Sequence, residues 1–429
     1  MRQSILGSVA AITLLAACSG GADDSAKTAP APDADAEAST DAAEAQTSSD
    51  VALEAGDDFQ ARLQTALIQA EEGSTITLPA GKFMMTDGLS LDVDGVTLTG
   101  AGQGETILDF SGQRGSGEGL LVTSDDVTLT DFTIQETKGD GIKSKGADRI
   151  IYRDLTVEWL GEPDEVNGAY GVYPVESTDV LVEDVTVRGA SDAGIYVGQS
   201  DKIIVRDSTA EYNVAGIEIE NSTNAEVYGN EVTNNTGGIL VFDLPDLPVM
   251  GGNSTKIYDN NIHHNNTRNF APKGNIVAGV PAGTGVIIMA NDKVEVTGNT
   301  FDQNQTAQVL VTAYTEEFTD EDYNPLPRNV YVHGNTYGEG GKNPQGLLGE
   351  FAMLLGGEVP AIVWDGVTRW HDGEDVDVNL VIDEDEGVGF VNLGLGAYPV
   401  KLTSVSPNQD RPDSEPFGTL DPVKLSHAE

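Results

Sequence analysis

Four side chains of the kinds that do acid–base chemistry recur at one position of a repeated pattern. Lys143, Tyr173, Tyr196 and Glu218 each lie two residues after a glycine that opens a short strand-like triplet. A lysine held among neighbours could act as a base or neutralise a carboxylate, or it could be an ordinary solvated lysine. The tyrosines could donate protons or stack on a sugar ring, or they could pack against each other as cross-strand aromatics do. We therefore take Lys143, Tyr173 and Tyr196 as candidate catalytic residues.

Further polar residues lie near this position and are candidate substrate-binding residues. Lys145 and Glu220 come two residues after Lys143 and Glu218, and Asp192 stands just before its triplet. Glu218 and Glu220 could act as acid or base, although in so acidic a chain a solvated surface is the favoured interpretation. Asp192 and the equivalent Asp140 could bind calcium or act as general acids, but aspartates at such places mostly make turns.

Insertions into the pattern carry the remaining candidates. His263, His264 and Arg268 make the segment 263–283 locally basic. A histidine over the groove could shuttle protons, so His264 is a candidate catalytic residue and His263 and Arg268 are candidate substrate-binding residues. The alternative is that both histidines hydrogen-bond within the loop. Trp159, in an earlier insertion, could be a sugar-stacking platform, and so a substrate-binding residue, or a loop anchor.

The sequence does not predict a metal site. No set of histidine, cysteine and carboxylate residues has the spacing of metal ligands. No cofactor is therefore expected, and calcium is the one exception left open.

The pattern that positions these residues repeats about every 22 residues, a period typical of a solenoid. Each unit contains three short stretches of alternating apolar and polar residues, separated by Asp and Asn turns. Three strands per coil predict an all-β fold, a right-handed, single-stranded parallel β-helix with stacked inward Val, Ile and Leu. The first stretches are opened by Gly119, Gly141, Gly171, Gly194, Gly216, Gly238 and Gly285, with Gln308 in the same place one turn later.

The β-helix is expected to cover residues 58–340. Before its first strands the sequence predicts an amphipathic capping helix. The apolar stripe of that helix consists of Phe59, Leu63, Leu67 and Ile68. After about residue 340 the period is lost, so 341–429 is predicted to be an irregular C-terminal β cap and a polar tail.

Long insertions flank the first strands on both sides. Segments 158–168 and 263–283 precede a first strand, and 243–256 and 313–328 follow one. Long loops on a rigid scaffold often carry function, so the outward face of the first strands is the predicted groove. The C-terminal part of that face is apolar and needs a cover. Its residues are Leu240, Phe242, Ile287 and Met289.

Composition limits the partners and the cellular setting. Acidic residues outnumber basic ones 70 to 23, and the net charge of −47 disfavours nucleic acid and anionic lipid as partners. The single cysteine, Cys18, ends MRQSILGSVAAITLLAAC, which resembles a bacterial lipoprotein signal. We expect residues 1–17 to be a signal peptide, Cys18 to be lipidated, and 18–57 to be a disordered acidic tether. The expected location is the cell envelope, with Ser19 favouring the outer membrane and the lipid as the sole membrane contact.

With this period and these turn residues, the chain resembles the pectin-lyase-like superfamily. The segments HHNNTRNFAPKGNIVAGVPAGTGVIIM and VPAIVWDGVTR resemble, more narrowly, a family of exported bacterial parallel β-helix repeat lipoproteins. That superfamily includes polysaccharide lyases, glycoside hydrolases, uronate epimerases and proteins without catalysis, so the resemblance implies one of these roles. The narrower resemblance implies a second exported protein as a partner. Of the polygalacturonase motif only Asp140 remains, in KGDGIKSK, and the Asp-Pro-His-Asp of alginate epimerases is absent.

Two functions are therefore predicted. In the first, the groove binds a polysaccharide, with a uronate-bearing glycan favoured, and a catalytic form would be a lyase or an epimerase. In the second, the protein is a non-catalytic surface or accessory protein that docks a glycan or a second exported protein. Catalysis requires Lys143, Tyr173 and Tyr196 to converge on one point. Protein docking requires the apolar part of the face to be left uncovered.

Overall fold

The computed structural model describes residues 50–115, 117–400 and 405–427. The predicted signal peptide (1–17), Cys18 and the predicted tether up to residue 49 lie outside the described residues. Within the described ranges, no helix is long and apolar enough to cross a membrane.

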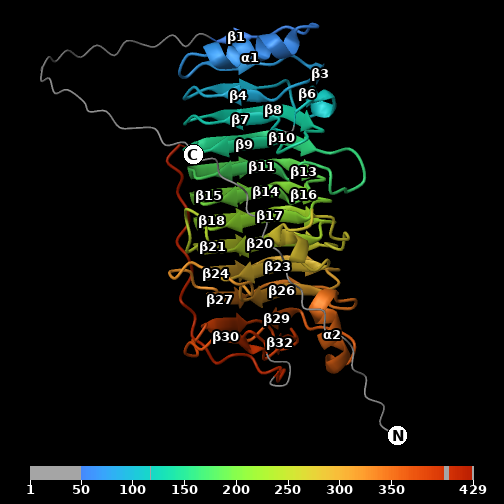
Figure 1. Cartoon of the computed structure of the whole chain (residues 1–429), viewed down its shortest axis with the longest axis vertical. Coiled ribbons are helices and arrows are strands. Elements are labelled where there is room, and N and C mark those ends of the chain that lie inside the picture. Colours follow the sequence, from blue (N-terminus) through green and yellow to red (C-terminus); the bar gives the residue numbers. More distant parts are fainter. Residues whose placement is uncertain (1–49, 116, 401–404, 428–429) are drawn as a thin grey trace, which may run out of the picture.

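The chain winds into a parallel β-helix, which confirms the predicted fold class (Figure 1). The first strand of each coil belongs to one long sheet, which we call the first-strand sheet. It contains, in chain order, β4 (Leu89–Leu91), β7 (Leu120–Val122), β9 (Ile142–Lys145), β11 (Tyr170–Val175), β14 (Ala193–Gly198), β17 (Ala215–Glu220), β20 (Gly237–Phe242), β23 (Thr284–Met289), β26 (Ala307–Thr312), β29 (Ile362–Trp364) and β32 (Phe390–Asn392).

The second and third strands form the other long sheet. The second strands and those that begin the fold are β1 (Val51–Ala52), β2 (Thr75–Thr77), β5 (Thr97–Thr99), β12 (Thr178–Glu183), β15 (Asp201–Arg206), β18 (Thr223–Tyr228), β21 (Asn253–Tyr258), β24 (Asp292–Thr297), β27 (Arg328–His333) and β31 (Leu380–Asp383). The third strands are β3 (Gly81–Met84), β6 (Thr106–Asp109), β13 (Thr186–Arg188), β16 (Thr209–Glu211), β19 (Glu231–Thr233), β22 (Asn261–His263), β25 (Thr300–Asp302) and β28 (Thr336–Tyr337). In the early coils, β8 (Thr128–Gln135) and β10 (Ile150–Glu158) are long strands that each take the place of both the second and the third strand.

The register of the first-strand sheet confirms the predicted outward ladder. Lys143 lies beside Tyr173, and Tyr196 beside Glu218. The ladder continues from Glu218 through Leu240 to Ile287. Because strand side chains alternate between faces, the residues between these positions point into the core. The chemistry-bearing side chains therefore share one outer face, and neighbouring coils lie about 4.8 Å apart.

Two stacks of buried asparagines hold the corners of successive coils together. Asn213 Nδ2 donates to Asn235 Oδ1 at 3.1 Å, and Asn235 Nδ2 donates to Asn265 Oδ1 at 3.0 Å. Each side chain also accepts from a backbone N–H one coil before it: Asn213 accepts from Ala190, and Asn235 accepts from Asn213, both at 2.9 Å. The parallel stack runs through Asn230, Asn260, Asn299 and Asn335. Polar groups that cannot reach water are satisfied in this way inside the turns.

The N-terminal end is closed by α1 (Phe59–Gln69), as predicted. Phe59, Leu63 and Leu67 are buried against the first coil, whereas Ile68 is 67% exposed and so does not belong to the predicted stripe. The ordered fold also begins before the predicted boundary at 58, because β1 pairs with β2.

The C-terminal end is more regular than the sequence indicated. Past residue 340, β29, β31 and β32 remain in parallel register with the sheets before them. The period is lost because insertions separate these strands, including α2 (Gly346–Leu355), which was not predicted. An irregular β element is also present, since β30 (Val367–Trp370) and β33 (Gly396–Tyr398) form a separate pair outside the two long sheets.

The C-terminal tail runs back along the second-strand side of the solenoid (Figure 1). The Leu420 N–H donates to Glu295 at 3.0 Å, and the Ser426 hydroxyl donates to Asp179. Asn408, nearer the start of the tail, pairs with Asn392 at the C-terminal end of the first-strand sheet.

Candidate functional site

The predicted residues of the middle coils come together on the first-strand sheet. Lys143 Nζ lies 4.6 Å from the centre of the Tyr173 ring and 3.8 Å from a carboxylate oxygen of Asp140. The rings of Tyr173 and Tyr196 meet edge to face at 4.9 Å. We call the set Asp140, Lys143, Tyr170, Tyr173, Asp192, Tyr196, Glu218 and Glu220 the acid–tyrosine cluster.

The cluster contains a third tyrosine that the sequence analysis missed. The ring of Tyr170 lies 4.5 Å from that of Tyr173 and 4.8 Å from that of Tyr196. In the register of the sheet its position is taken by Ala193 in the next coil and Ala215 in the one after. A tyrosine in a column of small residues was the signal that could have revealed it.

Burial keeps the tyrosine hydroxyls protonated. The pKa of Tyr173 is raised by burial and by the nearby charges of Asp140 and Glu220. Burial likewise holds the pKa of Tyr170 and of Tyr196 well above the usual range. These hydroxyls are therefore proton donors and hydrogen-bond donors at neutral pH rather than bases.

The carboxyl groups of the cluster are shifted toward neutral pH. Burial raises the pKa of Asp140 to about 6, although the charge of Lys143 opposes the rise. Burial also raises the pKa of Asp192 to about 7, against a hydrogen bond from Asn275 Nδ2 at 2.8 Å. Burial raises the pKa of Glu220 to about 7, and its carboxyl group accepts a hydrogen bond from the Tyr196 hydroxyl at 2.7 Å. Groups with a pKa close to the working pH suit proton transfer.

Glu218 is the most deeply buried acid of the cluster. It is 1% exposed, and its Oε2 atom has no hydrogen-bond partner in the described structure. Burial raises the pKa of Glu218 well above its usual value, with the charges of Glu220 and Asp192 adding to the effect. The interpretation of Glu218 and Glu220 as a solvated surface is therefore wrong, because the insertions cover this part of the sheet.

The segment 263–283, with the short 3-10 helix η2 (Ile276–Gly279), forms that cover. Its Phe270, Val277 and Val280 are buried in one apolar cluster with Leu240, Phe242 and Ile287 of the sheet. The apolar part of the face is thus closed by the protein itself: Leu240 is 0% and Phe242 2% exposed. The uncovered patch that protein docking required is absent at these residues.

The histidines do not lie over the groove. His263 ends β22, on the other long sheet, where its Nε2 pairs with Glu231 and its Nδ1 lies 3.3 Å from Thr233 Oγ1. His264 Nδ1 lies 2.8 Å from His263 Nδ1. The placement predicted for both residues is wrong, because the chain crosses to the groove only after His264.

Of the other candidate substrate-binding residues, one is buried and two are exposed. Trp159 is 2% exposed and donates through Nε1 to the Thr137 carbonyl at 2.7 Å, so it anchors its loop and cannot stack on a ligand. Lys145 is exposed at the end of β9, and its Nζ lies 3.6 Å from a carboxylate oxygen of Glu176. Arg268 is exposed beside a hollow of about 430 Å³ between the insertions that contain Asp164 and Phe270.

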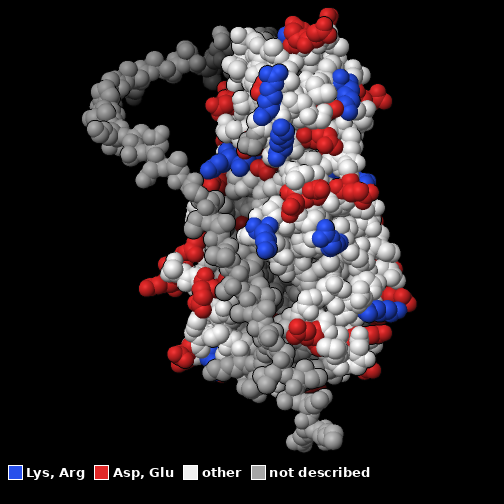
Figure 2. Space-filling model, turned by 45° about the vertical axis from the view of Figure 1, so that its right-hand side comes forward, with Lys and Arg blue, Asp and Glu red and all other residues white. Residues whose placement is uncertain are grey.

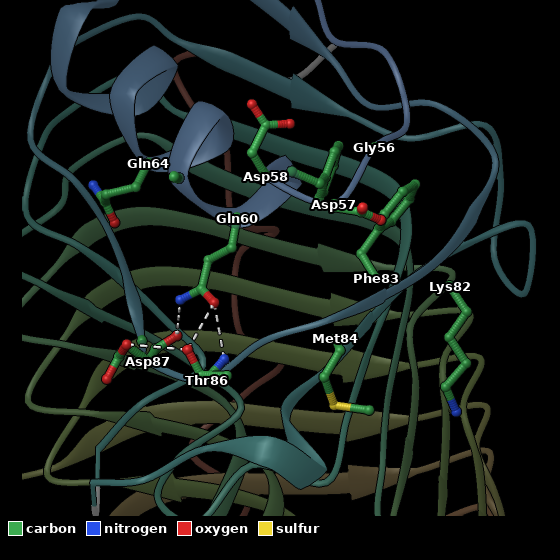
Figure 3. A pocket seen from close by; sticks show the side chains of 13 residues that line it. Gly56, Asp57, Asp58, Gln60, Gln64, Lys82, Phe83, Met84, Thr86 and Asp87 are labelled. Carbon is green, nitrogen blue, oxygen red and sulfur yellow. Dashed lines mark hydrogen bonds between the residues drawn. The ribbon is translucent and has the colours of Figure 1, made fainter.

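Hollows occur both on the groove face and elsewhere. One of about 250 Å³ lies between segment 263–283 and the sheet, lined by Ile276, Met289, Leu310 and Tyr314. A larger one of about 820 Å³ lies at the N-terminal cap, away from the cluster (Figure 3). There Gln60 accepts from the Thr86 N–H at 2.9 Å and donates to the Asp87 carbonyl at 3.1 Å, so its polar groups are already paired.

Charge on the surface is mixed. On the face drawn in Figure 2, Lys and Arg side chains lie among Asp and Glu and form no continuous basic band. Among the described residues, no group of three or more His, Cys, Asp or Glu is arranged to hold a metal ion.

Comparison with known proteins defines the class: the chain is a right-handed parallel β-helix protein. The family model described as a right handed beta helix region matches residues 94–246. No curated protein matches the sequence.

Several solved structures resemble the chain at low identity. The A-module of the Azotobacter vinelandii mannuronan C-5 epimerase AlgE4 is 17% identical, with a TM-score of 0.48 over 77% of this chain and 91% of that one. An alginate lyase from Paenibacillus sp. str. FPU-7 is 18% identical, with a TM-score of 0.43 over 67% of this chain and 95% of that one. Likeness at this level does not extend to activity.

Proposed function

We propose that this protein binds a polysaccharide along its first-strand sheet and acts on it by acid–base chemistry at the acid–tyrosine cluster. One observation carries the proposal: Lys143 lies against both the Tyr173 ring and the Asp140 carboxyl, at the half-buried edge of a group of acids with raised pKa. A cation, a base and a proton donor therefore meet at one place that a ligand can reach.

The arrangement suits a uronate-bearing glycan. Lys143 would pair with the sugar carboxylate and so make the neighbouring C5–H bond more acidic. Asp140, ionised above a pKa of about 6, would take the C5 proton. Tyr173, held protonated, would supply a proton.

The fate of the electron pair from C5 distinguishes two reactions. In a lyase the pair forms the C4–C5 double bond, the C4–O bond breaks, and the leaving oxygen takes the proton of Tyr173. In an epimerase C5 is reprotonated on the opposite face and no bond of the chain breaks. Both reactions need the same three side chains.

A non-catalytic binding role is the second candidate. The close packing of Tyr170, Tyr173 and Tyr196 is an aromatic surface of the kind that sugars stack on. A second exported protein would have to bind elsewhere than at Leu240 and Ile287, since both are buried.

We further propose that the chain is exported and anchored by lipid on Cys18, in the outer membrane, as a member of the β-helix lipoprotein family. Metabolic labelling with an alkyne fatty acid tests this in cells. Label that persists in Cys18→Ser would contradict lipidation at this residue.

The activity test uses the chain from residue 19 onward, incubated with alginate, polygalacturonate and a neutral glucan. Three signals are followed together: unsaturated uronate by absorbance, C5 configuration by NMR, and binding by calorimetry. We expect turnover of an acidic glycan that falls at least 100-fold in Lys143→Met and in Tyr173→Phe. Lys202→Met is the matched control, because Lys202 lies on β15 of the other sheet.

The outcomes separate the candidates. Binding without product favours the non-catalytic role. Full activity in Lys143→Met would place the chemistry elsewhere, and no binding of any of these glycans would refute the proposal.

A further inference from the structure

Three aromatic rings stack at the C-terminal end of the β-helix, far along the chain from the cluster. The ring of Trp370 lies 5.0 Å from that of Phe318 and 4.4 Å from that of Tyr398, at interplanar angles of 27° and 8°. Phe318 and Tyr398 lie on opposite faces of Trp370, since two rings on one face would collide. We call these three residues the ring stack. It fixes the Tyr398 ring without any ligand.

The ring stack opens onto a hollow of about 670 Å³. Tyr398 forms one wall, and Arg369 and His371 stand beside it. Tyr398 and Arg369 are half-buried and His371 is exposed, so all three can be reached from solvent. Arg369 lies 3.5 Å from Asp375, and His371 lies 3.4 Å from Glu317. A fixed aromatic wall beside side-chain N–H donors is suited to a pyranose ring, which presents an apolar face and a rim of hydroxyls.

A row of hollows leads from this one to segment 263–283, whose Asn275 contacts Asp192 of the cluster. Because Leu240 and Ile287 beneath that segment are buried, a ligand would pass over it. The hollow shares Leu395 with a second one of about 650 Å³. That hollow shares Val280 and Leu310 with the 250 Å³ hollow under segment 263–283. The insertion after β26 also spans the distance, since its Tyr314 lines the 250 Å³ hollow and its Phe318 belongs to the ring stack.

The length of the path corresponds to several sugar units. From Tyr196 on β14, the first-strand sheet continues through β17, β20, β23 and β26 to β29, which directly precedes β30, the strand that ends at Trp370. Five steps of about 4.8 Å make about 24 Å. A single sugar cannot contact both ends, whereas a polysaccharide can.

We infer that Tyr398, supported by Trp370 and Phe318, forms a distal subsite that stacks one sugar ring of the same polysaccharide whose reacting unit lies at the acid–tyrosine cluster. This inference rests on the proposed function. It makes the protein selective for long chains, because a chain that reaches both sites gains the second contact without a second association step.

The experiment compares short and long ligands on the chain from residue 19 onward. Oligomannuronates and oligogalacturonates of three and of ten units are titrated by calorimetry into the unaltered protein and into Tyr398→Ala, Tyr398→Phe and Arg369→Gln. We expect the ten-unit ligand of one series to bind at least 10-fold more tightly than the three-unit ligand. Tyr398→Ala should remove this difference and leave the three-unit affinity unchanged, while Tyr398→Phe keeps it.

Other results overturn the inference in recognisable ways. If Tyr398→Ala weakens the binding of the three-unit and the ten-unit ligand equally, the ring only supports the fold. Arg369→Gln, which leaves the ring stack intact, would then not change the affinity ratio of the two ligands. If Tyr398→Ala keeps the preference for the ten-unit ligand, the distal subsite is refuted. The proposed function would still stand if binding of the three-unit ligand depends on Lys143. No binding of either series refutes both.

Discussion

Glu218 shows how the site differs from an ordinary strand surface at the scale of single residues. Its carboxyl group is buried with one oxygen unpaired, and a free carboxylate in such a place would be costly. Burial therefore raises the pKa of Glu218 and favours its protonated form. Alternation along the strand predicted that Glu218 faces outward, but it could not predict that an insertion buries it.

Replacing Glu218 with glutamine should stabilise the protein at high pH. Glutamine has nearly the same shape but cannot ionise in the unfolded chain, so the unfolded state is no longer favoured by ionisation at high pH. We therefore expect a higher Tm at pH 8 and little change at pH 5. Thermal melts followed by circular dichroism measure this. Glu321→Gln, in an exposed loop position, is the control and should change neither value. A lower Tm at pH 8 would mean that Glu218 is ionised in the folded state.

At the scale of elements, turns rather than strands carry the polar interior. The asparagine stacks satisfy backbone groups of one coil with side chains of the next. The recurrence of Asp and Asn was visible in the sequence as a turn signal. That Asn213, Asn235 and Asn265 bond to each other was not visible, because it depends on which corners lie above one another.

Asn235→Ala should weaken the fold by about 2 kcal/mol or more, since the change leaves buried partners on both sides unpaired. Asn235 accepts from Asn213 N–H at 2.9 Å and donates to the Ala210 carbonyl at 2.8 Å. Urea denaturation measures the free energy of unfolding. Asn261→Ala is the control, because Asn261 is exposed and donates to Glu231 at the surface. Equal values for the two variants would contradict a role for the stack.

The whole molecule combines a strongly acidic surface with acids buried at one site. Between the usual pKa of a carboxyl group, near 4, and about 7, the folded state binds more protons than the unfolded state. Asp140, Asp192 and Glu220 all contribute in this direction. Their stabilisation is complete below about pH 4 and is lost as the pH rises through 6 to 7. Mutual repulsion within a chain of net charge −47 changes in the same direction.

We therefore expect a Tm several degrees higher at pH 5 than at pH 8, since each pKa unit corresponds to about 1.4 kcal/mol. Differential scanning calorimetry across this range tests it. The combined variant Asp192→Asn, Glu220→Gln should flatten the profile. A Tm that rises from pH 5 to pH 8 would show that these acids ionise freely in the folded protein.

The C-terminal tail belongs to stability rather than to the site. Deleting residues 417–429 removes the donor to the buried Glu295 and should lower the Tm by a few degrees. Glycan binding should stay unchanged, because these contacts lie on the second-strand side. Leu420→Pro, which removes only the N–H donor, should reproduce part of the loss. Weaker glycan binding in either variant would connect the tail to the groove.

The sequence by itself determined the coil, its period and the residues that face outward, because alternation and turn chemistry act within a few residues. It therefore placed Lys143, Tyr173, Tyr196 and Glu218 on one ladder. It could not determine burial or convergence, which depend on segments distant in the chain: Asn275 reaches Asp192 across 83 residues. The covered acids, the displaced histidines and the ring stack follow from how loops of different coils pack, and only the tertiary structure decided them.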